Sequence, residues 1–428
     1  MLIRSLYERL RDSLFALPAT IVALLGLASW GARRVDAWIP DDLPWLLPTT
    51  VDSTRAILST VATATITVAG IVFSMTAVVV QLATSQLSPR VTQGFLRDPF
   101  QQATIGFTVG TFVYSLLSLA NVQDSDRLPF SNQDFTATLA VILGVTSMIF
   151  IVLFIDRTMR NMRIDTVIRR LADSVESSFR SLPHRRPAED PVTPIPEVEA
   201  GSVVRVQRTG WVADVNWGRV LGAIPDETLV RVDLRVGDFI TEGEIAARTW
   251  PEVDAKAQHE IAAAVTVART RSVANDPAYG IRQMVDIGLR ALSPSLNDPT
   301  TGSDLVRHLG GPMQVLLLRD LPGRVIADDG GKRIYLPRAM TYSDYVHEAF
   351  REIRLHAGGQ PYVLHALVET LASLIAVVEA AELEGRTAAL VKEAEETLKL
   401  TRESDMPDFD KAHVLDFARR LGLEEAAQ

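Results

Sequence analysis

Acidic side chains and a histidine recur at every fourth position of the segment SDYVHEAFREIRLH. Residues four apart on a helix lie side by side, so these four share one face: Asp344, Glu348, Glu352 and His356. Carboxylates and histidine are ligands of divalent metals. A charged helical face is more often simply solvated, however, and the other histidines have no spacing that suggests cooperation. We therefore predict no metal site and no catalytic residues.

A second cluster of hydrogen-bonding side chains lies in SPSLNDPTT, just before a predicted helix. The free amides at a helix N-terminus attract anions. This makes a candidate ligand loop, whose residues are Ser295, Asn297, Asp298, Thr300 and Thr301. Asp298 also stands where an aspartate caps the same amides, and Pro299 fits the first helical position. We favour capping over ligand binding.

A polar stripe runs through the hydrophobic segment TATITVAGIVFSMTAVVVQLATSQLSPR (63–90). Small or hydroxyl-bearing residues return at alternating steps of four and three: Thr63, Thr67, Gly70, Ser74, Ala77, Gln81, Thr84 and Ser88. This repeat keeps them on one side of a helix. Two interpretations are open. The stripe either packs against other helices in lipid, or several copies of it surround a water-filled path, which requires an oligomer.

Two arginines, Arg90 and Arg97, follow the stripe. They either meet lipid phosphates at the membrane surface or ring the inner mouth of a pore. Residues 54–88, taken as one helix, would be about 50 Å long, which exceeds a hydrocarbon core of roughly 30 Å. We expect the end of this helix to project into the cytoplasm, which packing alone does not require.

Composition excludes several classes of function. The chain of 428 residues has no cysteine, and therefore no disulfide, thiolate metal site or cysteine nucleophile. It has no Gly-rich phosphate loop, zinc-protease helix or nucleophile elbow. The net charge of −9 includes no basic block suited to nucleic acid. We predict that the protein is not an enzyme, uses no cofactor and binds no nucleic acid.

Four stretches reach or approach the roughly 20 apolar residues that a bilayer requires. They define a transmembrane domain over 1–160, with spans at about 14–30, 56–81, 103–119 and 135–155. No ionisable residue interrupts the last three spans, which argues against a proton-driven carrier. The first span is predicted to be an uncleaved anchor rather than a signal peptide. The Lys and Arg counts of the flanking segments favour both termini in the cytoplasm.

The chain after the last span is typical of a water-soluble region. We predict an amphipathic helix and a Pro-rich linker over 161–199, a small β-barrel or sandwich over 200–250, and a mainly helical domain over 251–428. A hairpin is predicted at GRVIADDGGKRIYLP. The run LVETLASLIAVVEAA is predicted to be a buried core helix rather than a fifth span. The expected fold class is a membrane α-helical domain with four transmembrane helices plus a cytoplasmic α+β region.

Two long motifs carry a resemblance to a known family: SMTAVVVQLATSQLSPRVTQGFLRDPFQQATIGFTVGTFVYSLL and NDPAYGIRQMVDIGLRALSPSLNDPTT. Over nearly its whole length the chain resembles the uncharacterised bacterial predicted membrane proteins grouped as domain of unknown function 2254. The resemblance implies a multi-pass protein of the bacterial inner membrane with a cytoplasmic C-terminal region. It implies no activity, ligand or catalytic residue.

The leading functional hypothesis is an oligomeric ion channel or pore. The second hydrophobic span would line the path, and the cytoplasmic region would assemble or gate it. The expected partners are the lipid bilayer, further copies of the chain and inorganic ions. The alternative is a membrane-anchored sensor or scaffold, in which the cytoplasmic region binds a ligand or partner and the stripe only packs.

Overall fold

The computed structural model describes residues 16–38, 44, 46–86, 98–122, 133–161, 163–180, 201–273, 275–328, 330–383 and 385–423, with the backbone alone at 83–86 and 161. The chain divides into two compact units, Met1–Thr166 and Val167–Gln428. The predicted Pro-rich linker, 181–199, lies outside the described residues.

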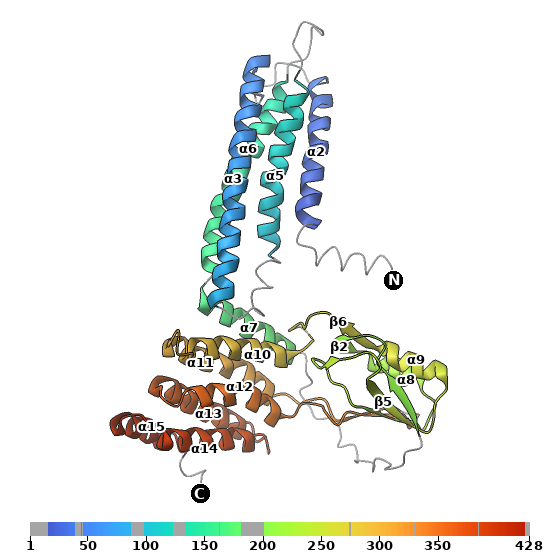
Figure 1. Ribbon diagram of the computed structural model, residues 1–428, viewed down its shortest axis with the longest axis vertical. Helices are drawn as coiled ribbons and strands as arrows, with labels where there is room; N and C mark the ends of the chain where they lie inside the picture. Colours follow the sequence, from blue (N-terminus) through green and yellow to red (C-terminus); the bar gives the residue numbers. More distant parts are fainter. Residues whose placement is uncertain are drawn as a thin grey trace. The chain divides into compact units, whose positions relative to one another are not determined.

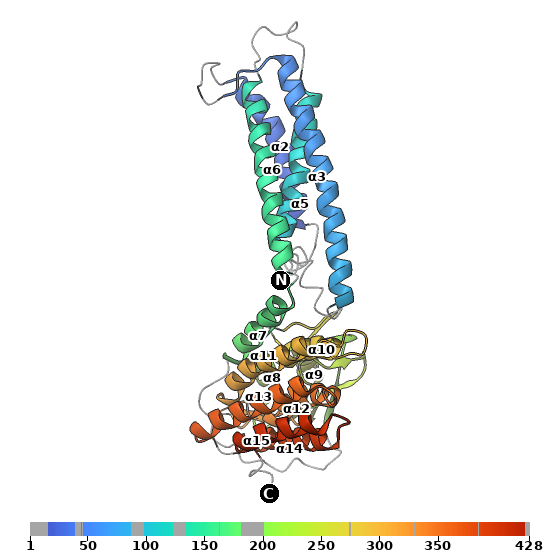
Figure 2. The ribbon, with the colours of Figure 1, turned by 90° about the vertical axis from the view of Figure 1, so that its left-hand side faces the viewer.

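The first unit is a bundle of four helices that run side by side (Figures 1 and 2). They are α2 (Ala16–Asp36), α3 (Val51–Gln86), α5 (Pro99–Ala120) and α6 (Asp134–Asn161). All four are long and apolar enough to cross a membrane. Helices α3, α5 and α6 cover their predicted spans and extend beyond both ends, because polar residues continue the backbone hydrogen bonding that the hydropathy pattern does not report. Helix α2 extends beyond the C-terminal end of the first predicted span, and the start of that span, residues 14 and 15, lies outside the described residues.

Helix α5 packs against the other three helices, and glycines allow its closest approach. A Cβ added at Gly106 would lie 2.8 Å from the Cα of Pro18 on α2, and one added at Gly110 would lie 2.6 Å from Cδ1 of Leu25. Glycines four apart are a common contact motif of membrane helices, since they let two backbones come close. The spacing is visible in the sequence.

Replacing Gly106 with leucine is expected to destabilise the bundle by about 1–3 kcal/mol, because the added side chain meets backbone atoms of α2. Gly70→Leu on α3 is the matched control, since a Cβ there meets nothing within 4 Å. Thermal unfolding of the purified protein in detergent measures both. Equal midpoints for the two variants would contradict this account of the α2–α5 contact.

Hydrogen bonds from polar side chains also connect α2, α5 and α6. Ser29 and Ser118 are 3.0 Å apart, Ser147 donates to Thr111 at 3.1 Å, and the Tyr114 hydroxyl donates to the Thr136 carbonyl at 3.1 Å. Such bonds are one of the main attractions between helices in lipid. These inward-facing hydroxyls therefore contribute to the packing of the three helices.

Acidic residues fasten one end of the bundle. Asp36 accepts a hydrogen bond from the backbone amide of Phe135 at 2.9 Å, and Asp134 accepts one from the amide of Thr49 at 2.8 Å. An aspartate at the start of a helix satisfies amides that have no partner within the helix. Asp36 thus holds the end of α2 to the first turn of α6.

The second unit contains a layer of helices and two sheets. The helices are α7 (Ile164–Arg180), which begins just before the boundary between the units, α8 (Trp217–Ala223), α9 (Ala255–Ala264), α10 (Pro277–Ala291), α11 (Pro299–Leu317), α12 (Tyr342–His356), α13 (Pro361–Ala380), α14 (Ala388–Glu403) and α15 (Asp408–Arg420). α10 and α11 begin at prolines preceded by capping aspartates, Asp276 and Asp298, as their sequence pattern indicates.

The amphipathic helix α7 buries its apolar face in this unit. Its buried residues are Val167, Ile168, Ala172, Val175 and Phe179. The Phe179 ring meets the Tyr345 ring of α12 edge-on, with centroids 5.4 Å apart. Val175 packs against α10 so closely that a Cβ at Gly280 would lie 2.3 Å from its Cγ2.

Helix α13 is the fifth helix of the described chain that is long and apolar enough to cross a membrane. It lies among α11, α12, α14 and α15. Its apolar side chains include Leu364, Leu367 and Leu371, which are fully buried. Contact with four helices explains an apolar composition without a bilayer.

The strands form two open sheets. They are β1 (Ser202–Arg205), β2 (Gly210–Val215), β3 (Leu229–Val232), β4 (Phe239–Ile240), β5 (Ile245–Trp250), β6 (Val265–Ala268), β7 (Val325–Ala327) and β8 (Arg333–Tyr335). The orders are β1-β5-β3-β8-β7 and β4-β2-β6. No closed barrel forms among the described strands, so the barrel half of the prediction is wrong. Both sheets contribute to one hydrophobic cluster.

The sheets draw on residues beyond the predicted boundary at 250. The predicted hairpin forms as β7 and β8, and β8 then pairs in parallel with β3, Val230 opposite Ile334. Both of these side chains are fully buried. The pairing joins segments about a hundred positions apart, and local sequence patterns do not report such contacts.

Candidate functional site

Helix α3 has two different faces. The buried face packs against α5 and α6 and includes Leu58, Ala62, Thr65, Ala69, Val72 and Val79. Residues two apart on a helix point in nearly opposite directions. The predicted stripe accordingly faces away from the bundle, and its six residues with described side chains are all exposed: Thr63, Thr67, Gly70, Ser74, Ala77 and Gln81.

Packing within the described bundle does not explain the stripe. A Cβ added at Gly70 would meet no atom within 4 Å, so a small residue is not needed there to admit a neighbouring helix of the same chain. The small and polar composition of this face must be explained by something outside the described bundle, namely lipid, another copy of the chain or water.

The stripe extends beyond Thr63, its first predicted residue, toward the start of α3. Residues at the same helical spacing and equally exposed are Asp52, Ala56, Ser59 and Thr60. The carboxylate of Asp52 is 97% exposed and stands 3.9 Å from the Arg55 guanidinium. The repeat of four and three continues through these positions, so counting backward from Thr63 finds them.

Hydroxyl groups on this face are bonded to their own helix. Thr60 Oγ1 donates to the carbonyl of Ala56, and Thr67 Oγ1 donates to the carbonyl of Thr63, both at 2.7 Å. Such bonds let a threonine remain in a helix at low cost where no water is present. They also fix the direction of the hydroxyl proton.

Other predicted pore residues are not described. Ser88, Arg90 and Arg97 lie outside the described residues, and for Thr84 the backbone alone is described. The inner mouth therefore stays a prediction.

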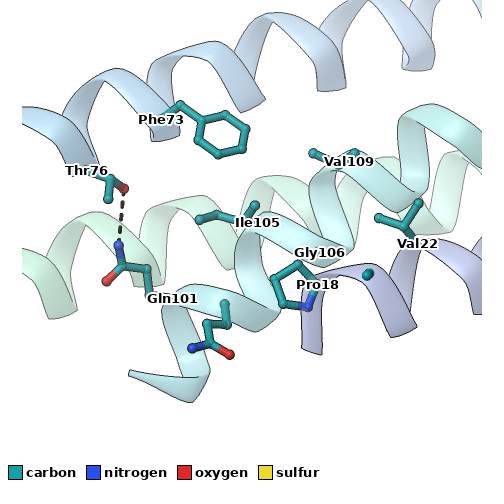
Figure 3. Close-up of a pocket in the computed structure, with 10 residues that line it drawn as sticks. Pro18, Val22, Phe73, Thr76, Gln101, Ile105, Gly106 and Val109 are labelled. Carbon is teal, nitrogen blue, oxygen red and sulfur yellow. Dashed lines mark hydrogen bonds between the residues drawn. The ribbon is translucent and has the colours of Figure 1, made fainter. Parts of the chain in front are cut away.

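A cavity of about 480 Å³ lies between α2, α3 and α5, beside the stripe (Figure 3). Its lining is mostly apolar and includes Pro18, Val22, Phe73, Ile105 and Val109. At its edge the Gln101 side chain donates to Thr76 Oγ1 at 3.3 Å. None of the described lining residues is titratable, so the cavity suits an apolar chain rather than acid–base chemistry.

The carboxylate face of α12 is occupied by other contacts. Arg282 of α10 donates to both oxygens of Glu352, at 2.7 and 3.0 Å, and these bonds hold the pKa of the Glu352 carboxyl below its usual range. Asp344 instead closes a capping box with Thr341. No group of three histidine, aspartate or glutamate side chains in the described part of the chain is placed to hold a metal ion.

The candidate ligand loop is organised around its cap. Asp298 accepts hydrogen bonds from the amide and the hydroxyl of Thr301, at 3.1 and 2.6 Å, and these bonds lower the pKa of its carboxyl. Asn297 accepts from Gln360 at 2.8 Å, while Ser295 bonds to Ser293 at 3.1 Å. The amides of Thr300 and Thr301 both donate to Asp298, so the cap takes the amides that an anion would need.

Four side-by-side apolar helices and a C-terminal region of strands and helices define a multi-pass membrane protein. The chain belongs to the family described as "Predicted membrane protein (DUF2254)", which matches residues 11–373. It is similar to "Uncharacterized protein Rv1290c" of Mycobacterium tuberculosis (strain ATCC 25618 / H37Rv) and "Uncharacterized protein Mb1321c" of Mycobacterium bovis. Each is 28% identical over 432 residues, which cover 97% of this chain and 81% of the relative. No solved structure matches the chain.

Proposed function

We propose that the protein is an oligomeric ion channel or pore of the bacterial inner membrane, in which α3 from several copies lines the path. The observation that carries the proposal is the small and polar face of α3, which points away from its own bundle. One helix cannot enclose a path, so the face requires further copies of the chain. The cytoplasmic region assembles or gates the oligomer.

A comparison between two helices of the same bundle supports this proposal. The exposed face of α6 carries large apolar residues, as lipid contact favours: Ile142, Val145, Ile149 and Val152. The stripe along the centre of the exposed face of α3 carries none among its described residues, although exposed apolar residues flank it on both sides: Ile66 and Phe73 on one, Ile71, Val78 and Leu82 on the other. The exposed faces of α3 and α6 therefore differ in composition, and contact with water suits the small and polar residues of α3.

The proposed topology has four membrane helices, α2, α3, α5 and α6, with both termini in the cytoplasm. The fifth apolar helix, α13, is then a core helix of the cytoplasmic region. Its burial among four other helices supports this assignment. Cysteine labelling from either side of the membrane tests it, and the absence of native cysteines makes single substitutions unambiguous.

Current across a planar bilayer that holds the purified protein, in asymmetric KCl, tests the proposed activity. Discrete steps are the expected result. A silent bilayer over the full voltage range, with the protein shown to be inserted and oligomeric, would count against the channel and favour the membrane-anchored sensor or scaffold.

Asp52 is expected to strengthen the preference for cations. It is exposed on the same face as the stripe, so an oligomer places several Asp52 carboxylates around one end of the path, and rings of acidic side chains favour cations. Asp52→Lys should move the reversal potential toward that of chloride by roughly tens of millivolts. Asp405→Lys makes the same charge change in the second unit and should leave the reversal potential unchanged. A shift with both variants, or with neither, argues against an Asp52 ring.

A further inference from the structure

A polar cavity of about 330 Å³ lies between α12 and α14 in the second unit. Its volume is at the small end of the range for ligand pockets. The lining includes Ser343, His347, Arg351 and Arg354 from α12, and Lys392 and Glu393 from α14. It shares no residue with the stripe on α3 or with the ligand loop predicted from the sequence.

The floor of the cavity is a buried ion pair. Nε of Arg354 donates to Glu393 at 2.6 Å, and the two side chains are 10% and 7% exposed. Glu396 stands 3.8 Å from the same guanidinium. Burial raises the pKa of the Glu393 carboxyl even though Arg354 opposes the shift. The charge of Arg354 is thus matched by its neighbours, and the pair joins the two helices.

The rim of the cavity carries positive charge that is not matched in this way. Arg351 donates to Nε2 of His347 at 2.9 Å, because a guanidinium has no acceptor atom. Across the described ranges, no carboxylate forms an ion pair with Arg351 or with Lys392. At the cavity, Arg351 of α12 and Lys392 of α14 are therefore exposed cations without an ion-pair partner among the residues that the structure describes, on a protein whose net charge is −9.

We propose that this cavity binds the phosphate group of a small ligand. An arginine donates paired hydrogen bonds to phosphate oxygens, and a lysine adds a mobile charge. Arg351 and Lys392 provide both from opposite helices, with the Ser343 hydroxyl as a further donor at the same cavity. The volume admits inorganic phosphate or a sugar phosphate, and either would bridge α12 and α14.

Calorimetric titration of the purified full-length protein with inorganic phosphate and with ribose 5-phosphate tests this site. We expect saturable binding that Arg351→Gln and Lys392→Gln each weaken about tenfold, since each removes a charge-assisted hydrogen bond. Lys392→Arg keeps the charge and should retain binding. Lys399→Gln is the matched control, because Lys399 is exposed on the same helix but lies outside the cavity.

The outcomes separate the sources of the phosphate group. Tighter binding of ribose 5-phosphate assigns a phosphorylated metabolite, and equal or tighter binding of inorganic phosphate assigns the free ion. Absence of binding by the wild-type protein to both probes overturns the proposal. So does a loss with Lys399→Gln as large as that with Lys392→Gln, because it would show general attraction by surface charge.

Discussion

Ser74→Trp is expected to reduce single-channel conductance below about a tenth of the wild-type value. Ser74 stands in the middle of the exposed stripe, two turns from Thr67 and Gln81. If several copies of α3 surround the path, the substitution places an indole from every copy at one level. The open path is then filled by apolar rings, which exclude both ions and water.

The matched control places the same side chain elsewhere on the bundle surface. Val152 on α6 is 67% exposed and lies among large apolar residues, so Val152→Trp adds equal bulk on a face assigned to lipid. It should conduct as the wild type does. If Ser74→Trp conducted normally in an assembled oligomer, Ser74 would not line the path and the stripe would serve contact between copies instead.

Phe179→Ala is expected to destabilise the second unit by about 3–5 kcal/mol. The ring is fully buried at the end of α7 and packs edge-on against Tyr345. Its removal leaves a cavity at the point where α7 joins the helical layer, and it also removes an aromatic pair. The midpoint of thermal unfolding of the full-length protein, followed by circular dichroism, should fall clearly.

Phe409→Ala is the control for this change. Phe409 is 81% exposed, so the same truncation creates no internal cavity and should leave the midpoint within experimental error. If Phe179→Ala also kept the wild-type midpoint, α7 would not be held by its apolar face, although the structure shows that face buried.

Local chemistry made much of the helical structure predictable. The predicted amphipathic helix after the last span forms as α7, and α11 starts at Pro299 behind its Asp298 cap, as predicted; α10 starts in the same way at Pro277 behind Asp276. In each case the determining contacts lie within a few residues of one another, as caps and amphipathic faces do. The four apolar helices of the first unit were predictable for the same reason.

Contacts between distant segments were not predictable. The parallel pairing of Val230 with Ile334 and the approach of Gly106 to Pro18 depend on which elements meet. Arg282 pairs along its own helix with Asp286, as residues four apart on a helix can, but it also holds Glu352 of α12. A periodic pattern shows that residues share a face, but it does not show what that face meets.

The same distinction applies to the candidate site. The spacing of Thr63, Thr67 and Ser74 placed them on one side of α3, and the structure shows which side that is. The sequence could not show it, because small residues suit both a helix contact and a water-filled path. Direction came only from the packing of α3 on α5 and α6.

The hydroxyl groups bonded to their own helix on α3 have a consequence for ion dehydration. Thr60 and Thr67 commit their protons to carbonyls one turn back, so the remaining surface of each oxygen is a pair of lone pairs. Lone pairs can replace water around a potassium or sodium ion, but they repel chloride. In the proposed channel these hydroxyl oxygens would thus act toward an ion only as acceptors, as ether oxygens do. The path would therefore still favour cations over anions after the Asp52 carboxylate is removed, although less strongly.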